Sequence, residues 1–160
     1  MASVATAPSA DDGEFKVGFA ISVYQCSGDD NSNWGAFERR RGLFGRSPID
    51  NGDLCGEACT FFQSEWRQDI DRAHSLGSNA FRLSLEWSRI EPEQGRIDGE
   101  AVQRYRDIID YLHSKGMEPN VTLHHFVHPL WFERLGGFEN EGGIDLFVDY
   151  ARTAFGCGRR

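Results

Sequence analysis

The clearest hydrophobic pattern in the chain lies in residues 78–90, where apolar and polar side chains alternate. The alternating series is Phe81, Arg82, Leu83, Ser84, Leu85, Glu86 and Trp87. A period of two predicts a β-strand with side chains on two opposite faces. Because helical patterns flank this stretch, we expect a central, parallel strand with both faces covered. Burial of Arg82 and Glu86 on one face then requires either an internal ion pair or a polar site.

The remaining periodic segments alternate between strand and helix patterns. Strands are predicted for residues 15–25 and 119–124, and helices for residues 65–76, 100–115 and 144–155, with a short helical piece at 130–135. Ser64 and Asp98 are the expected N-caps of the first two helices, and Gly77 and Gly116 their stops. Residues 26–62 show no sustained period, and so long a loop in a compact domain is commonly functional.

The order of strand, helix, strand, helix, strand, helix indicates an α/β fold with parallel strands and right-handed crossovers. The first and third strands would be apolar edges, which favour aggregation. The isolated chain is therefore expected to be only marginally stable.

Length and charge narrow the classes of function. The chain of 160 residues fits one domain, and its net charge of −8 disfavours a nucleic-acid or anionic-membrane partner. The one basic cluster, Arg39–Arg41 with Arg46 nearby, is interpreted as solvated surface. Residues 1–14 lack the features of a signal peptide and are expected to be a disordered lead. With no membrane anchor predicted, a cytoplasmic location is expected.

The four cysteines, Cys26, Cys55, Cys59 and Cys157, are expected to be free thiols, since no export signal is seen. Cys55 and Cys59 could begin a metal site, but no second pair stands at ligand spacing. No cofactor or metal is predicted.

Polar and aromatic groups follow each predicted strand at its C-terminal end. They are Tyr24 and Gln25, then Glu86 and Trp87, then His124, His125 and Phe126. In parallel α/β folds ligands bind at this edge. Amide, imidazole and indole groups suit a sugar, because they provide directional hydrogen bonds for hydroxyls and flat faces for the ring.

Other interpretations of the same residues stay open. Gln25 could cap a turn, Trp87 could belong to the core, and His124 or His128 could be loop surface. A histidine pair could also bind a metal, but His124 and His125 are adjacent strand residues that point to opposite faces.

Several segments together resemble the N-terminal part of glycoside hydrolase family 1. They are FKVGFAISVYQ, the GEAC stretch at 56–59, FRLSLEWSRIEPEQG, EPNVTLHHF and the later Gly-Gly-Phe. The resemblance runs from about Phe15 to Phe155. It implies the first three βα units of a TIM (β/α)8 barrel, with residues 15–160 ending before the fourth strand, and a retaining β-glucosidase or β-galactosidase activity.

The resemblance also implies roles for individual residues. Gln25 and His125 match a glutamine and a histidine that bind sugar hydroxyls. Arg82 matches an arginine that hydrogen-bonds the nucleophilic carboxylate and holds it ionised. Phe126 occupies the place of a frequent tryptophan, which keeps an apolar wall but loses an indole N–H.

Both catalytic glutamates of the family pattern are missing from these residues. Retaining hydrolysis needs two carboxyl groups about 5–5.5 Å apart. The family's Asn-Glu-Pro and Glu-Asn-Gly tripeptides do not occur, and the similar stretch at 138–142 falls in a loop. Glu86 is the best substitute by position, but pairing with Arg82 is expected to lower its pKa, which does not suit an acid. The sequence therefore looks like a truncated or mis-spliced product, or an incomplete gene model.

The sequence thus predicts a partner that is a β-linked glycoside or oligosaccharide, hydrolysed with retention by a longer protein. A galactosyl-transferring relative, a non-catalytic sugar-binding fragment and a remnant without a role are the alternatives. A nucleotide binder is disfavoured because no Gly-rich phosphate loop follows a strand.

Overall fold

The computed structural model describes residues 15–157, so the predicted disordered lead at 1–14 lies outside the described residues. The strands are β1 (Gly18–Ala20), β2 (Ala80–Ser84) and β3 (Glu118–Thr122). The longer helices are α3 (Trp66–Ser75), α5 (Gly99–Ser114) and α7 (Gly143–Cys157). The shorter helical segments are α1 (Asn33–Glu38), η1 (Leu43–Gly45), η2 (Asp50–Gly52), α2 (Cys55–Ala58), η3 (Phe61–Glu65), α4 (Trp87–Ile90), α6 (Leu130–Arg134) and η4 (Gly137–Glu139).

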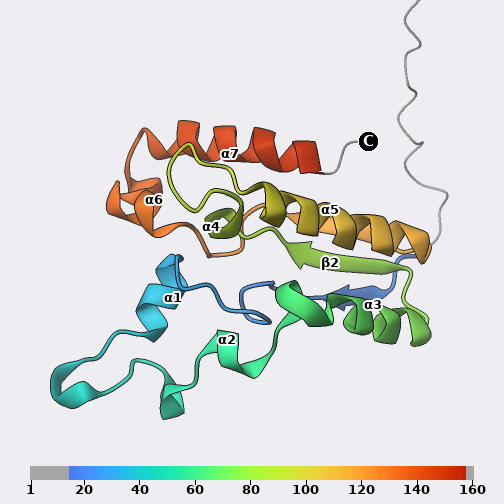
Figure 1. Ribbon diagram of the computed structural model, residues 1–160, viewed down its shortest axis with the longest axis horizontal. Helices are drawn as coiled ribbons and strands as arrows, with labels where there is room; N and C mark the ends of the chain where they lie inside the picture. Colours follow the sequence, from blue (N-terminus) through green and yellow to red (C-terminus); the bar gives the residue numbers. More distant parts are fainter. Residues whose placement is uncertain (1–14, 158–160) are drawn as a thin grey trace, which may run out of the picture.

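The three strands form one parallel sheet in the order β1-β2-β3 (Figure 1). Phe19 pairs with Phe81, and Phe81 pairs with Pro119, which fixes the register across the sheet. Gly18 is required at the first pairing, because a Cβ there would lie 1.9 Å from the carbonyl oxygen of Ala80. The prediction of three consecutive βα units with parallel strands is confirmed, and β1 and β3 are edges of the described sheet.

Helices cover one face of the sheet. Helix α5 packs against α3 on one side and α7 on the other. Phe81 and Leu83 of β2 are buried in the same core cluster as Ile70 of α3 and Ile108 of α5. Arg82, between Phe81 and Leu83, is exposed instead. The expectation that both faces of this strand are covered is therefore wrong at Arg82.

The N-caps were predicted with mixed success. Asp98 caps α5 as expected, because its Oδ1 accepts hydrogen bonds from the N–H groups of Glu100 and Ala101. Ser64 does not cap α3; it lies within the π-helical turn η3, and its hydroxyl pairs with that of Thr60 at 2.9 Å. The carboxylate of Glu65 accepts from the Thr60 N–H instead. The turn η3 runs directly into α3, so helical structure begins at Phe61 rather than at Glu65.

All three strands end earlier than the sequence pattern predicts. β1 stops at Ala20, and the chain then forms a turn over residues 23–27. β2 stops at Ser84, and Trp87 starts the single turn of α4 with its side chain fully buried. The interpretation of Trp87 as a core residue is therefore confirmed. Within residues 15–157 no helix is long and apolar enough to cross a membrane.

Candidate functional site

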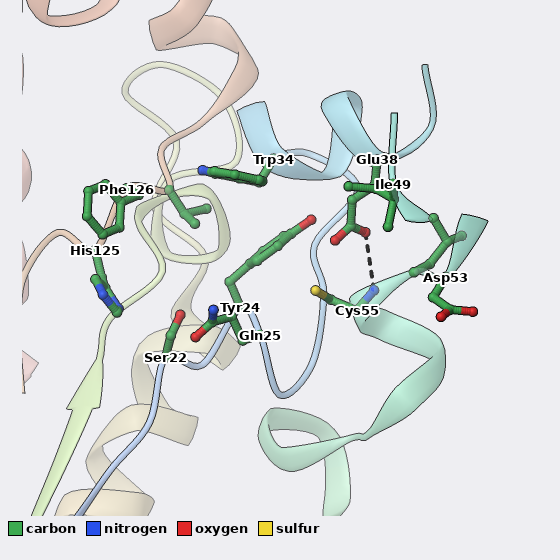
Figure 2. Close-up of a pocket in the computed structure, with 12 residues that line it drawn as sticks. Ser22, Tyr24, Gln25, Trp34, Glu38, Ile49, Asp53, Cys55, His125 and Phe126 are labelled. Atoms are coloured by element: carbon green, nitrogen blue, oxygen red, sulfur yellow. Dashed lines mark hydrogen bonds between the residues drawn. The ribbon is translucent and has the colours of Figure 1, made fainter. Parts of the chain in front are cut away.

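A pocket of about 410 Å³ lies where the ends of β1 and β3 meet the irregular segment that contains α1 and α2 (Figure 2). Its lining consists of Ser22, Tyr24, Gln25, Trp34, Glu38, Ile49, Asp53, Leu54, Cys55, His125, Phe126 and Val127. The predicted substrate-binding residues Gln25, His125 and Phe126 all belong to this lining. Gln25 and His125 are 100 positions apart in the sequence. They meet at one pocket because the carboxyl ends of parallel strands lie on the same side of the sheet.

A tight turn places Gln25 after β1. The N–H groups of Cys26 and Gly28 donate to the carbonyl oxygens of Ser22 and Tyr24, at 3.2 and 2.6 Å. Gly28 has a φ of +59°, and a Cβ there would lie 2.5 Å from the backbone nitrogen of Gly56. Only glycine fits this close contact, which brings the turn against α2.

His125 and Phe126 follow β3 and are held in place by α1. The Asn33 side chain donates to the carbonyl oxygen of Phe126 at 3.2 Å and accepts from the His128 N–H at 3.0 Å. Phe126 adopts a φ of 65°, which is unusual for a bulky side chain, and 71% of its surface is exposed. Nδ1 of His125 is buried without a hydrogen-bond partner among the described residues. A buried ring nitrogen of this kind needs a hydrogen-bond partner that the described residues do not supply.

The far wall of the pocket comes from the segment that showed no period in the sequence. The indole of Trp34 lies across the pocket from Gln25 (Figure 2). Glu38 is buried and accepts a hydrogen bond from the Cys55 N–H at 3.2 Å. Burial and the nearby Glu38 carboxylate raise the pKa of Tyr24 far above its usual range. The signal in the sequence for this wall was the length of the segment 26–62 without a period, which contains Trp34 and Glu38.

Arg82 does not line the pocket. Its Nε donates to the hydroxyl of Thr122 on β3 at 2.9 Å. The predicted pairing with Glu86 is wrong, because Glu86 Oε1 accepts instead from the Ser84 hydroxyl at 2.7 Å and the Tyr24 N–H at 3.1 Å. Arg82 and Glu86 do not share a face of one strand, because β2 ends at Ser84, between them, and the chain turns into α4.

The pKa of Glu86 is raised to about 7, opposite to the expected direction. Desolvation is the main cause, since Glu86 is buried and its Oε2 has no hydrogen-bond partner among the described residues. The bonds from Ser84 and Tyr24, and the charge of Arg89, oppose the rise. Glu86 does not line the pocket. Its contact with Tyr24, together with the contact of Ser84 with Val23, links the segment after β1 to the end of β2.

The neighbouring histidines, His124 and His128, do not line the pocket. His124 stacks with His128 and packs edge-on against Phe138, and burial lowers its pKa to about 4. Nε2 of His128 lies 2.6 Å from the carboxylate of Glu133. His128 is buried, so its interpretation as loop surface is wrong. No group of His, Cys, Asp and Glu side chains within residues 15–157 is placed to hold a metal ion.

Cys26, Cys55 and Cys59 are free thiols, as predicted, and the Cys157 side chain lies outside the described part of the structure. Burial, with the neighbouring Cys59, raises the pKa of Cys26 to about 11. Burial and the Glu38 carboxylate raise that of Cys55 to about 12. Cys26 and Cys55 are therefore protonated at neutral pH, which does not suit a nucleophile.

The family model of glycosyl hydrolase family 1 matches residues 12–157. The chain belongs to glycosyl hydrolase family 1. The resemblance seen in the sequence is therefore confirmed, and the three-stranded sheet is part of that family's barrel rather than a closed barrel.

Similar proteins include named glycosidases from bacteria and archaea. 6-Phospho-beta-glucosidase GmuD of Bacillus subtilis (strain 168) is 38% identical over 114 residues, which are 70% of this chain and 24% of that protein. Beta-glucosidase A of Thermotoga maritima is 35% identical over 144 residues, or 88% of this chain and 32% of the relative.

Solved structures agree with these relatives. A family 1 β-glucosidase from Thermotoga maritima, in complex with isofagomine lactam, superposes with a TM-score of 0.82 at 33% identity, covering 90% of this chain and 33% of that one. A beta-glycosidase from Pyrococcus horikoshii gives a TM-score of 0.77 at 38% identity, covering 89% and 32%. The chain thus spans about a third or less of the length of these relatives.

Proposed function

We propose that this chain provides part of the glycone-binding site of a retaining β-glycosidase, with Gln25 and His125 as hydrogen-bonding partners of the sugar hydroxyls. The observation that supports this is the meeting of Gln25, His125 and Phe126 at one pocket. Family membership supplies the reaction class, and the glycosidases named above act on β-linked sugars according to their names.

The chemistry of the pocket suits a pyranose. Gln25 offers both a donor and an acceptor, and His125 offers one of each in its neutral form. The faces of Trp34 and Phe126 provide flat apolar surface for the C–H side of a ring. Such a pocket recognises a sugar through a few placed polar groups within a mostly apolar wall.

The electrostatics of the pocket favour a neutral glycone over a 6-phosphorylated one. Glu38 and Asp53 are part of the lining, and no lysine or arginine of the described chain is. A phosphate beside two carboxylates would be repelled. We therefore propose a β-glucoside or β-galactoside as the substrate of the whole protein, in preference to the phosphorylated sugars in the names of some relatives.

Arg82 is proposed to support a nucleophilic carboxylate that comes from outside these residues. Its side chain is exposed on the central strand of the sheet and donates through Nε to the hydroxyl of Thr122. An exposed guanidinium at this position can still donate two hydrogen bonds to a carboxylate. Because both glutamates of the family pattern are missing here, the 160-residue chain should bind sugar without turning it over.

The test is ligand-observed NMR of the chain with methyl β-D-glucopyranoside, together with an assay of 4-nitrophenyl β-glucoside cleavage. Saturation transfer to the sugar is expected, to be lost in Gln25→Ala and His125→Ala. Gln103→Ala on the exposed side of α5 is the matched control and should bind as the original chain does. Binding that survives both pocket variants, or turnover by the chain, would contradict the proposal.

A further inference from the structure

The loop of residues 39–48, here named the arginine loop, has no role in the pocket described above. It follows α1, contains η1, and reaches away from the sheet and helices (Figure 1). Four arginines lie in it, at positions 39, 40, 41 and 46, in a chain whose net charge is −8. The sequence pattern alone indicated solvated surface for this cluster.

Three of the four guanidinium groups lack an acidic partner within residues 15–157. Arg39 pairs with the carboxylate of Asp30. Arg40, Arg41 and Arg46 form no ion pair with any carboxylate of the described chain: Arg40 stacks over Phe37, and Arg41 donates to the carbonyl oxygens of Glu38 and Arg40. The loop therefore presents uncompensated positive charge.

The tip of the same loop exposes two large apolar side chains. Leu43 is 80% exposed and Phe44 is 89% exposed, the largest exposed fraction among the apolar residues of the described chain. Phe44 has a φ of 66°, although a bulky residue rarely adopts left-handed backbone. Strain of this kind persists where a function uses it, so the outward aromatic side chain calls for a partner.

The apolar tip and the arginines on either side of it line one open hollow. It is lined by Arg40, Arg41, Gly42, Leu43, Phe44, Arg46, Ser47 and Pro48, and none of these residues is acidic. Apolar side chains that enter the headgroup region, flanked by arginines that contact lipid phosphates, form the physical basis of interfacial membrane binding.

We propose that the arginine loop is a peripheral binding site for membranes that contain anionic phospholipids, with Leu43 and Phe44 inserted at the interface. The negative charge of the remaining chain does not prevent this, because interactions beyond about 8 Å are largely screened at physiological ionic strength. Binding through one loop is reversible and needs no spanning helix. The site is independent of the proposed glycosidase function, since the arginine loop and the sugar pocket have no lining residue in common.

Vesicle flotation of the 160-residue chain tests the proposal. Vesicles of phosphatidylcholine alone are compared with vesicles in which a quarter of the lipid is phosphatidylserine. We expect binding to the anionic vesicles only, weakened on raising the salt from about 0.1 M to about 0.5 M. Absence of binding to the anionic vesicles would overturn the proposal.

Variants assign the binding to the loop. Arg40→Gln with Arg41→Gln should weaken partitioning by about tenfold or more, since each arginine near an anionic surface contributes separately. Phe44→Ser should weaken it by a similar factor through lost apolar burial. Arg134→Gln on α6 and Phe155→Ser on α7 remove exposed side chains of the same types elsewhere and should bind normally.

Two further results would overturn the proposal. One is vesicle binding that the loop variants leave unchanged, which would indicate that the exposed sheet edges adsorb to lipid. The other is binding of soluble poly-L-glutamate, sensitive to the arginine substitutions, without any binding to vesicles. That result would make the loop a site for an acidic polypeptide.

Discussion

The backbone N–H of Tyr24 donates to the buried carboxylate of Glu86 at 3.1 Å, which joins the end of β1 to the end of β2. The Ser84 hydroxyl reinforces the link, because it accepts from the Val23 N–H and donates to the same carboxylate oxygen. Gln25 follows Tyr24 directly. The position of Gln25, the proposed sugar-binding residue that follows β1, therefore depends on a buried acid just after the end of β2.

The raised pKa of Glu86 links stability to pH. With a folded-state pKa of about 7 against 4.5 for an ordinary glutamate, the folded chain binds a proton more tightly than the unfolded chain. Its contribution to stability is present below pH 4.5 and is lost as the pH rises through 7. Glu86→Gln keeps an acceptor for Tyr24 without the charge, so it should raise the free energy of unfolding at pH 8 by about 2–3 kcal/mol and change it little at pH 5.

Urea denaturation at both pH values measures this difference. Glu141→Gln, at an exposed turn position, is the matched control and should show the same change at pH 5 and pH 8. If Glu86→Gln is equally or less stable than the original chain at pH 8, the carboxylate is ionised in the fold at little cost.

The cap of α5 offers a local test of the fold. Asp98→Ala leaves the N–H groups of Glu100 and Ala101 without their side-chain acceptor and should lower the free energy of unfolding by about 1 kcal/mol. Asp98→Asn retains the acceptor and should lower it much less. Equal losses in the two variants, measured by urea denaturation, would show that charge rather than capping matters at this position.

Phe126 is a test of the sugar site. Phe126→Trp restores the indole N–H of the family pattern at the pocket wall, and one added hydrogen bond should tighten binding of methyl β-D-glucopyranoside by about 2–10-fold. Phe126→Leu keeps an apolar wall without the flat ring and should bind more weakly. Titration by ligand-observed NMR gives the affinities. A tryptophan variant no better than leucine would place Phe126 outside the sugar's reach.

Strongly periodic parts of the fold could be predicted from the sequence. The apolar residues of α5 recur at helical spacing and Asp98 caps its start, so the local sequence specifies that helix. Apolar and polar residues alternate in β2 from Phe81 to Ser84, so the strand is also marked locally. The prediction of the strand's end was wrong, because the residues that follow β2 fit both an alternating strand pattern and a single helical turn. Leu85, Glu86 and Trp87 continue the alternation, yet α4 starts there because the chain must leave the sheet.

The site was predictable only where a family motif or a strand end marked it. Gln25 and His125 follow strands, so their meeting at one pocket follows from parallel pairing. Trp34 and Glu38 come from a segment of short helical turns without a period, so only the tertiary fold brings them to the pocket. The raised pKa of Glu86 likewise depends on burial that no local pattern encodes.

The edge strand β1 should govern self-association of the isolated chain. Its neighbourhood exposes apolar side chains, with Val17 55% exposed beside an unpaired edge of the described sheet. Edge strands with apolar side chains pair with other chains, and an added lysine opposes this. Val17→Lys should therefore reduce the apparent size of the chain in dynamic light scattering at concentrations where the original chain associates. Val148→Lys, an equally apolar site on α7, is the matched control and should leave association unchanged. A chain that is monomeric and melts sharply without either substitution would contradict the expected marginal stability, because the edges would then be harmless on their own.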